Sequence, residues 1–453
     1  MHLRPLVTHL CLSLLAAAAW AQPVLVGAPA SGEQMRFDPS LSSVVAGSDW
    51  DITIRMQDDN ENTSLDYTYR RWWHLQIENL TPGDILNFDI THAGYDSIIL
   101  PTWSLSTDGV NFGAHSRLPV SAVPTRTGSA GNWTHSFSVQ VPAGVVAIRL
   151  AKWFPYTPAM FSDYRTTVLT SPHVSESVIG TTALGRPVRM WTITDTSVPD
   201  TGKRRVWIHT CVHPAENTAH YTMEGLVSWL TSGQLEPELL LDSVIFNIIP
   251  VANPDGQWLG NYRTNSNSVN LENEWGYPYT TSAEEVSAMI SQIEAFMGTA
   301  GSPGSNPIEI ILNLHSTHGN GYPFHFVHYA TPGWTYPDGG VIPEVNALEV
   351  SWVNALSNRS PLVDLGSSQS SSAGAPSRPF VESMMHDRWS SDPAWTGPKV
   401  MAITLEGTYW RGPDTVNWGT DDDYRQMGEE MGFAIADFLG ITVPAELTGF
   451  TMR

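Results

Sequence analysis

After Thr170 the sequence alternates strongly apolar runs with segments of helical periodicity. The apolar runs are 205–212, 244–251, 308–314 and 400–405, and the helical patterns lie near 218–230, 284–297, 344–356 and 423–439. Strands without polar alternation are buried on both faces. This half therefore predicts an α/β domain whose mixed sheet is covered by helices on both faces. Ligands of such domains bind beyond the carboxyl ends of the strands.

The first half of the chain follows a different pattern. From about Val24 to Tyr164, short aromatic and β-branched runs such as 72–77, 85–90 and 139–150 are separated by Pro, Gly, Asn and Asp. Short strands at near-regular spacing predict an all-β sandwich. We therefore expect two domains, a β-sandwich over residues 22–170 and an α/β domain over residues 171–445.

The first residues have the pattern of a signal peptide. Arg4 precedes an apolar run that ends in Ala19, Trp20 and Ala21. This order predicts cleavage near Ala21 and export to the periplasm or the medium, whereas the alternative is an N-terminal core helix. No later stretch supplies the roughly 20 apolar residues of a membrane span, so we expect none.

The charge of the chain limits its partners. The 453 residues carry a formal net charge of -22. Such an excess of acid excludes nucleic acid as an expected partner. Solubility is the simplest explanation of the charge, and selection for cationic substrates is the alternative. The sequence gives no indication of the oligomeric state.

A histidine and a glutamate three residues apart form a candidate metal-binding pair. His213 and Glu216 follow the first apolar run of the second half, so a turn can bring both side chains to one point. A catalytic zinc takes three N or O ligands and keeps a position open for water. The same spacing recurs at His173 and Glu176, but these residues lie in the Ser- and Pro-rich segment between the two halves. We expect the pair at the strand end to bind the metal.

The third ligand should be a distant histidine at another strand end. His315 directly follows the run 308–314 and has that position, and His318 is the nearest alternative. His325 and His328 complete a histidine-rich stretch. We interpret these last two as surface or supporting residues rather than as a second metal site.

A series of short motifs then follows in a fixed order. They are His213-Pro-Ala-Glu216, Asn253-Pro-Asp-Gly256, Gly260-Asn-Tyr-Arg263, Val269-Asn-Leu271, His315-Ser and Thr404-Leu-Glu406-Gly. The series resembles the zinc carboxypeptidase (M14) family, and most of all its cytosolic-carboxypeptidase-like branch. In that branch a β-sandwich precedes the peptidase domain, and Phe154-Pro-Tyr156-Thr resembles its junction motif. The resemblance implies a zinc metallocarboxypeptidase-type hydrolase that acts on a peptide or amide bond near a chain end.

The resemblance also implies roles for single residues. It implies one zinc ion with the ligands His213, Glu216 and His315. Glu406 would be the general base, and it follows a run so apolar that an unpaired, functionless carboxylate there would be costly. Arg263 would bind the substrate and stabilise the developing oxyanion. Asn270 corresponds to the residue that accepts the ring N–H of the first zinc histidine.

One motif departs from the family pattern. The family follows its Val-Asp-Leu or Ala-Asn-Leu step with Asn-Arg, a pair that binds the C-terminal carboxylate of the peptide. Here the stretch reads Leu271-Glu272-Asn273-Glu274-Trp275, so Asn273 stands at the arginine position beside Glu272. Both are candidate substrate-binding residues. A neutral amide does not replace a bidentate guanidinium, and Glu272 would repel a carboxylate.

Three explanations of this departure remain. Arg378 or Arg388 supplies the clamp from another loop, the substrate presents an amine or amide, or carboxylate binding has been lost. The second explanation describes a zinc amidase or endopeptidase acting on cationic or cell-wall peptides. A non-catalytic protein whose aromatic-rich β domain binds a polymer is a further alternative. The family also has a mobile aromatic side chain that acts as an acid near the active site. This residue has no clear counterpart between Ser360 and Pro398.

Overall fold

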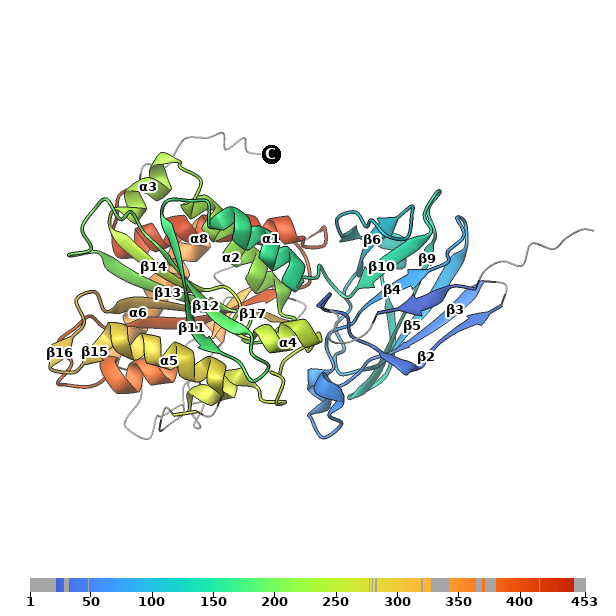
Figure 1. The fold of residues 1–453 in the computed structure, drawn as a ribbon, viewed down its shortest axis with the longest axis horizontal. Coiled ribbons are helices and arrows are strands. Elements are labelled where there is room, and N and C mark those ends of the chain that lie inside the picture. The colour runs from blue at the N-terminus through green and yellow to red at the C-terminus, as the bar shows by residue number, and fades with distance from the viewer. Residues whose placement is uncertain are drawn as a thin grey trace, which may run out of the picture.

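The structure is a computed structural model of the chain. It describes residues 22–27, 32–47, 49–276, 278, 280–281, 283–318, 321–326, 342–363, 369–370, 380–414 and 416–443. Figure 1 shows a strand-rich N-terminal domain, blue to teal, beside a larger domain in which helices pack on a sheet. The predicted signal peptide lies outside the described residues. Among the described helices, none combines the length and the apolar character needed to cross a membrane.

The N-terminal domain consists of two five-stranded sheets with the orders β1-β4-β10-β6-β7 and β2-β3-β5-β9-β8. Burial alternates along β5 and β9, so Phe88, Ile90 and Phe137 point into the core between the sheets. The expected β-sandwich is confirmed. Its strands are β1 (Val24–Val26), β2 (Asp38–Ala46), β3 (Trp50–Arg55), β4 (His74–Glu78), β5 (Ile85–Ala93), β6 (Thr102–Ser106), β7 (Ser116–Arg117), β8 (Thr125–Ser129), β9 (Asn132–Gln140) and β10 (Ala147–Ala151).

The apolar run 139–150 is not one strand. β9 ends at Gln140 and β10 begins at Ala147. Between them Val145 N–H donates to the carbonyl of Pro142 at 3.2 Å, and Gly144 has a φ of 79°. Glycine accepts this left-handed conformation at little cost, so the chain reverses there. The valines on either side of the turn hide it in the sequence pattern.

The C-terminal domain is built on an eight-stranded mixed sheet with the order β11-β12-β14-β13-β17-β20-β18-β19. Its four central strands run parallel, and β14 is buried at every residue. The strands are β11 (Val174–Thr181), β12 (Pro187–Ile193), β13 (Arg204–Thr210), β14 (Val244–Ile249), β17 (Ile308–Thr317), β18 (Phe324–Phe326), β19 (Gln369–Ser370) and β20 (Met401–Thr408), and a separate hairpin holds β15 (Gly298–Thr299) and β16 (Ser302–Pro303).

Helices cover both faces of this sheet, which confirms the expected α/β architecture. Ile208 of β13 packs in one apolar cluster with α2, α6 and α8, whereas its neighbour Trp207 packs in another with α5 and α7. Four of these helices match the predicted helical patterns. The helices are α1 (Pro158–Val168), α2 (Asn217–Leu230), α3 (Leu235–Leu241), α4 (Pro254–Leu259), α5 (Glu284–Met297), α6 (Pro343–Arg359), α7 (Val381–Met385) and α8 (Asp421–Leu439).

Helix α1 packs with the C-terminal domain. Thr157 caps it by accepting a hydrogen bond from Met160 N–H, and Phe161 stacks on Trp191 at a centroid distance of 5.9 Å. Trp153 belongs to the same apolar cluster as the central sheet, together with Ala151 of β10. Helix α1 therefore packs with the C-terminal domain although it precedes the expected boundary at Thr170.

Candidate active site

A tight turn after β13 presents the first two candidate ligands. β13 ends at Thr210, and Cys211 then adopts a φ of 61°, which is rare for a residue with a side chain. α2 begins at Asn217, so His213 and Glu216 lie in the short connection between strand and helix. Pairing in the sheet brings this connection to the carboxyl end of β17.

The other two candidate residues lie on neighbouring strands. β17 and β20 run parallel, and their register pairs His315 with Glu406. The site thus forms at the carboxyl ends of the strands, where the fold class predicts it. The four residues come from three different segments of the chain but meet at one edge of the sheet.

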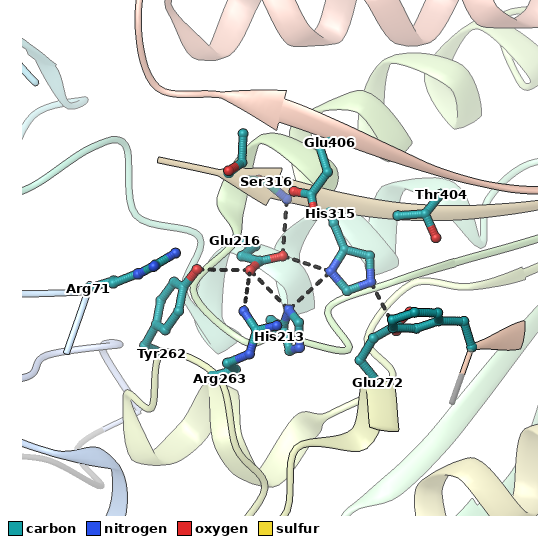
Figure 2. A pocket seen from close by; sticks show the side chains of 12 residues that line it. Arg71, His213, Glu216, Tyr262, Arg263, Glu272, His315, Ser316, Thr404 and Glu406 are labelled. Atoms are coloured by element: carbon teal, nitrogen blue, oxygen red, sulfur yellow. Dashed lines mark hydrogen bonds and ion pairs between the residues drawn. The ribbon is translucent and has the colours of Figure 1, made fainter. Parts of the chain in front are cut away.

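Ligand atoms of His213, Glu216 and His315 converge within 4.8 Å of one another. The two Nδ1 atoms are 3.1 Å apart, and Glu216 places Oε1 2.9 Å from His213 Nδ1 and Oε2 2.7 Å from His315 Nδ1. Figure 2 shows the three side chains pointing toward one another. All three are buried.

The outer nitrogen of each imidazole faces an oxygen. His213 Nε2 lies 2.9 Å from Asn270 Oδ1, and His315 Nε2 lies 3.2 Å from Glu272 Oε2. These acceptors place the proton on Nε2 and leave the Nδ1 lone pair directed inward. Two imidazole nitrogens and one carboxylate form the donor set of a catalytic zinc site. The residues therefore fit a zinc ion.

Buried charges set the electrostatics of the site. Burial opposes the charge of Glu216, but His213 and His315 hold its pKa well below the ordinary range. Burial likewise opposes the charge of His315, but Glu272 and Glu216 raise its pKa well above the usual value. Burial and then the charge of Glu216 raise the pKa of Glu406. Three carboxylates gathered in a buried site favour a bound cation, whose charge would lower the pKa of Glu406 again.

The Glu406 side chain keeps one oxygen available. Its Oε2 is buried and has no hydrogen-bond partner among the described residues. An orphaned carboxylate oxygen in a buried site is costly. Glu406 lies beside His315 and lines the cavity. Its free oxygen is therefore placed to act as a base there and not to hold the fold together.

The loop that carries Arg263 is held by the N-terminal domain. Asp59 lies in the short 3-10 helix Asp59–Glu61, and its carboxylate accepts backbone N–H groups of Tyr262, Arg263 and Thr264 at 2.7, 2.8 and 2.8 Å. Arg263 extends back toward the candidate ligands, with NH1 3.7 Å from Glu216 Oε1. The position of this guanidinium thus depends on both domains.

A second buried link runs from the N-terminal domain to a candidate ligand. Lys152 Nζ donates to His318 Nδ1, and His318 Nε2 lies 2.9 Å from the Tyr262 hydroxyl. Tyr262 donates in turn to Glu216 Oε1 at 2.9 Å. The directions agree only if His318 is neutral with its proton on Nε2. Burial, followed by the charge of Lys152, accordingly lowers the pKa of His318 well below its usual value.

These groups enclose a cavity of about 270 Å³. Twelve residues line it: Arg71, His213, Glu216, Tyr262, Arg263, Glu272, His315, Ser316, Thr317, Phe380, Thr404 and Glu406. Eleven of them belong to the C-terminal domain. Arg71 is the exception, because it precedes β4 in the N-terminal sandwich.

Arg263, Glu272 and Asn273 were expected to contact substrate, and the last two point in different directions. Glu272 lines the cavity, but its carboxylate is engaged by His315 and by Asn313 Nδ2 at 3.0 Å. Asn273 is exposed and is not among the lining residues. Both lie in the 3-10 helix Leu271–Trp275, where successive side chains point in different directions. The structure therefore gives Glu272 a contact with a candidate ligand and brings only Glu272 to the cavity.

Of the two proposed replacement clamps, the structure describes only Arg388. Arg388 pairs with Glu294 and lies over the ring of Trp389 at 4.8 Å. It is not among the lining residues. Arg378 lies outside the described residues.

Among the described residues, neither His173 nor His325 belongs to the metal cluster. His173 Nε2 lies 3.1 Å from Glu238, and Glu176 is occupied by Arg165, so this second pair forms no metal cluster in the described part of the chain. His325 is buried on β18, and His328 lies outside the described residues. The structure thus brings together the strand-end pair and His315, as the sequence position predicted.

Three site residues of the N-terminal domain escaped the sequence analysis: Asp59, Arg71 and Lys152. Each of them lies far from the candidate ligands along the chain and reaches them only through packing of the two domains. Arg71 had a weak signal, since Arg70 and Arg71 stand together before a buried Trp-Trp step in a strongly acidic chain. No spacing rule connects such a pair with a metal site.

Comparison with known proteins agrees with this geometry. Residues 164–325 match the model of the zinc carboxypeptidase family, Peptidase_M14. Cytosolic carboxypeptidase 6 of Caenorhabditis elegans is 25% identical over 244 residues, which are 52% of this chain and 51% of that protein. Cytosolic carboxypeptidase 1 of Mus musculus is 24% identical over 293 residues, 55% of this chain and 23% of that protein. The chain thus spans about half of the first relative's length and a quarter of the second's.

The fold is shared with a solved structure over nearly its whole length. A metallo-carboxypeptidase from Burkholderia cenocepacia superposes with a TM-score of 0.68 at 20% identity, covering 92% of this chain and 99% of that one. Such coverage includes the strand-rich N-terminal domain as well as the central sheet. The likeness therefore extends to the arrangement of both domains.

Proposed function

We propose that the chain, whose residues 164–325 match the zinc carboxypeptidase family model, is a zinc-dependent metallocarboxypeptidase that hydrolyses a peptide or amide bond near a chain end. One observation carries the proposal. The Nδ1 atoms of His213 and His315 and the Glu216 carboxylate converge, each imidazole is oriented by an oxygen on its far side, and Glu406 stands in register with His315.

The site residues account for the steps of such a hydrolysis. A zinc ion bound by His213, Glu216 and His315 would acidify a water molecule and polarise the carbonyl of the scissile bond. Glu406 presents a buried carboxylate oxygen without a partner among the described residues, so it can take a proton from the attacking water and deliver it to the leaving amine. Arg263 offers a permanently charged donor to the oxygen on which negative charge develops.

The alternative functions receive less support. An amidase or endopeptidase for cationic or cell-wall peptides would use the charge of Glu272, but that carboxylate already binds His315 and Asn313. A polymer-binding β domain would need exposed aromatic rings. Trp72, Trp73 and Trp153 are buried in cores, and in the described part of the sandwich Tyr67 is the large aromatic side chain that is exposed.

Glu406→Gln tests the proposal because it keeps the size and hydrogen bonding of the side chain but removes the basic oxygen. We expect the variant to bind zinc like the wild type and to hydrolyse peptides about 100-fold more slowly or worse. Glu309→Gln is the matched control, since Glu309 lies near the other end of β17 and pairs with Arg204. Equal rates for Glu406→Gln and the wild type would refute the role of Glu406.

We further propose that the chain is exported. The support is the run of apolar residues after Arg4 that ends in Ala19, Trp20 and Ala21. N-terminal sequencing of protein purified from its source should find Gln22 at or near the first position. Recovery of the chain inside the cell with its first residues intact would contradict export.

A further inference from the structure

The cavity holds two guanidinium groups but lacks the arginine that the family uses for the substrate carboxylate. Arg263 approaches Glu216 and is held there by Asp59, as oxyanion stabilisation requires. At the family's clamp position the chain has Asn273, which is exposed. Arg71 is the remaining arginine among the lining residues.

The backbone of Arg71 is held by hydrogen bonds, whereas its guanidinium forms no hydrogen bond or ion pair among the described residues. Its backbone N–H donates to Tyr69 O at 2.9 Å, and its carbonyl accepts a hydrogen bond from Lys152 Nζ at 2.8 Å. Its Nε atom is buried and has no hydrogen-bond partner among the described residues. Figure 2 shows the guanidinium extending toward Tyr262 and the candidate ligands. A donor held in this way is ready to bind an anion.

The carboxylates of the cavity do not satisfy Arg71. Glu216 binds the two histidines, Glu272 is engaged by His315 and Asn313, and Glu406 Oε2 has no partner among the described residues. In Figure 2, Arg71 and Glu272 lie on opposite sides of the candidate ligands. The cavity is therefore polarised, with a free positive group on one side and a carboxylate tied to His315 on the other.

Arg71 also stands where the cavity continues along the N-terminal domain. Arg71 and Thr317 line both the active-site cavity and a second cavity of about 390 Å³. Tyr95 and Ser97 of the sandwich border this second cavity. A substrate longer than one residue that follows it would pass the guanidinium.

We propose that Arg71, supplied by the β-sandwich domain, binds a carboxylate of the substrate and makes the enzyme selective for anionic peptides. The proposal rests on the proposed function and deepens it. Two carboxylates qualify, the α-carboxylate at the peptide's C-terminus and an acidic side chain beside the scissile bond. Lys152 is excluded as the clamp because its ammonium already binds Arg71 O and His318. The N-terminal domain then selects the substrate while the C-terminal domain cleaves it.

The test uses Arg71→Met in the zinc-loaded full chain, with three sets of matched peptides. The first set carries a free C-terminus and neutral side chains, the second the same peptides as C-terminal amides, and the third amides with Glu or Gln beside the scissile bond. We expect Arg71→Met to raise KM about 10- to 100-fold for carboxylate-bearing peptides and to leave neutral amides unchanged. Arg71→Lys should recover part of the loss, because it keeps the charge without the planar fork.

The peptide sets separate the two sources of the carboxylate. A KM increase confined to free C-termini assigns Arg71 to the α-carboxylate, and one confined to Glu-containing amides assigns it to the side chain. Arg388→Met is the matched control, since this guanidinium pairs with Glu294 away from the cavity, and it should behave like the wild type. An equal loss for charged and neutral peptides, or no change in KM for Arg71→Met, would overturn the proposal.

Binding distinguishes failure of this inference from failure of the proposed function. Calorimetric titration of the free-acid and amide peptides into Glu406→Gln measures recognition without turnover. Tighter binding of the acid that disappears in the Glu406→Gln, Arg71→Met double variant supports the clamp even if hydrolysis proves not to depend on Glu406. The same titration with the Glu- and Gln-containing amides tests the side-chain carboxylate. Equal binding of acid and amide together with equal binding of the Glu and Gln peptides overturns the clamp whatever the rates show.

Discussion

The two domains bury their strands in opposite ways. In the sandwich, β5 and β9 alternate buried and exposed residues, whereas in the C-terminal sheet β13 and β14 are buried almost throughout. The buried parallel strands direct their carboxyl ends to one place, and there the chain gathers His213, Glu216, His315 and Glu406. The sandwich has no such shared end, so it contributes single residues from loops. One domain therefore supplies the candidate metal ligands and the other supplies residues that hold and polarise the candidate site.

The largest expected effect concerns the ligand set of the C-terminal domain. His315→Ala removes one of three ligands, so we expect zinc no longer to be retained through gel filtration and hydrolysis to fall below detection. His173→Ala, at the competing His-x-x-Glu spacing, should retain zinc and activity. Metal analysis and peptide hydrolysis measure both. Zinc retained by His315→Ala but lost by His173→Ala would reverse the assignment.

The next effect concerns the stability of the domain interface. Asp59→Ala leaves three backbone N–H groups of the 262–264 loop, two of them buried and that of Arg263 partly buried, without their acceptor. We expect the free energy of unfolding to fall by about 3 kcal/mol, with a lower kcat because Arg263 is less well held. Denaturant titration provides the measurement. Asp51→Ala, at an exposed carboxylate in β3, is the control, and its free energy of unfolding should stay within about 0.5 kcal/mol of the wild type. Equal losses of stability in the two variants would show that Asp59 does not hold the 262–264 loop.

A smaller effect tests whether the sandwich supports a zinc ligand from a distance. Lys152→Met breaks the chain of hydrogen bonds through His318 and Tyr262 to Glu216. We expect zinc affinity to drop about 10-fold, near the lower end of what outer-shell changes cost. Competition with a chelator measures it. Lys203→Met removes another buried lysine, one that binds Thr194 far from the site, and should leave the affinity unchanged. Equal zinc affinities for the two lysine variants would show that the hydrogen bonds from Lys152 to Glu216 do not stabilise zinc binding.

The last effect concerns acid stability, in which the two domains should behave alike. Burial lowers the pKa of His115 in the sandwich and of His220 in α2 to about 3. Each histidine stays neutral in the folded chain but takes up a proton below pH 6.5 once unfolded, so its stabilising contribution is present above pH 6.5 and is lost as the pH falls toward 4. His115→Gln and His220→Gln should each reduce the slope of stability against pH by about 1.4 kcal/mol per unit over this range. A slope unchanged by either variant would contradict the buried neutral state.

The sequence predicted the C-terminal domain better than the sandwich because continuous apolar strands and helical periodicity are strong local signals. The strand-end positions of His213, His315 and Glu406 followed from the same pattern. The division of 139–150 into two strands was not predictable, because a Pro-Ala-Gly turn lies between valines. The contact between Glu272 and His315 depends on how a 3-10 turn meets β17. Contributions such as that of Lys152 depend on the packing of two domains, which no local spacing encodes.

The most direct test of the account is a zinc titration of the metal-free chain, with bound zinc and peptide hydrolysis followed together. We expect hydrolysis to be absent without metal, to rise in proportion to bound zinc and to reach its plateau at about one ion per chain. Glu406→Gln should bind the same equivalent without gaining activity. Hydrolysis by the metal-free chain, or a plateau reached while His213, Glu216 and His315 hold no zinc, would contradict it.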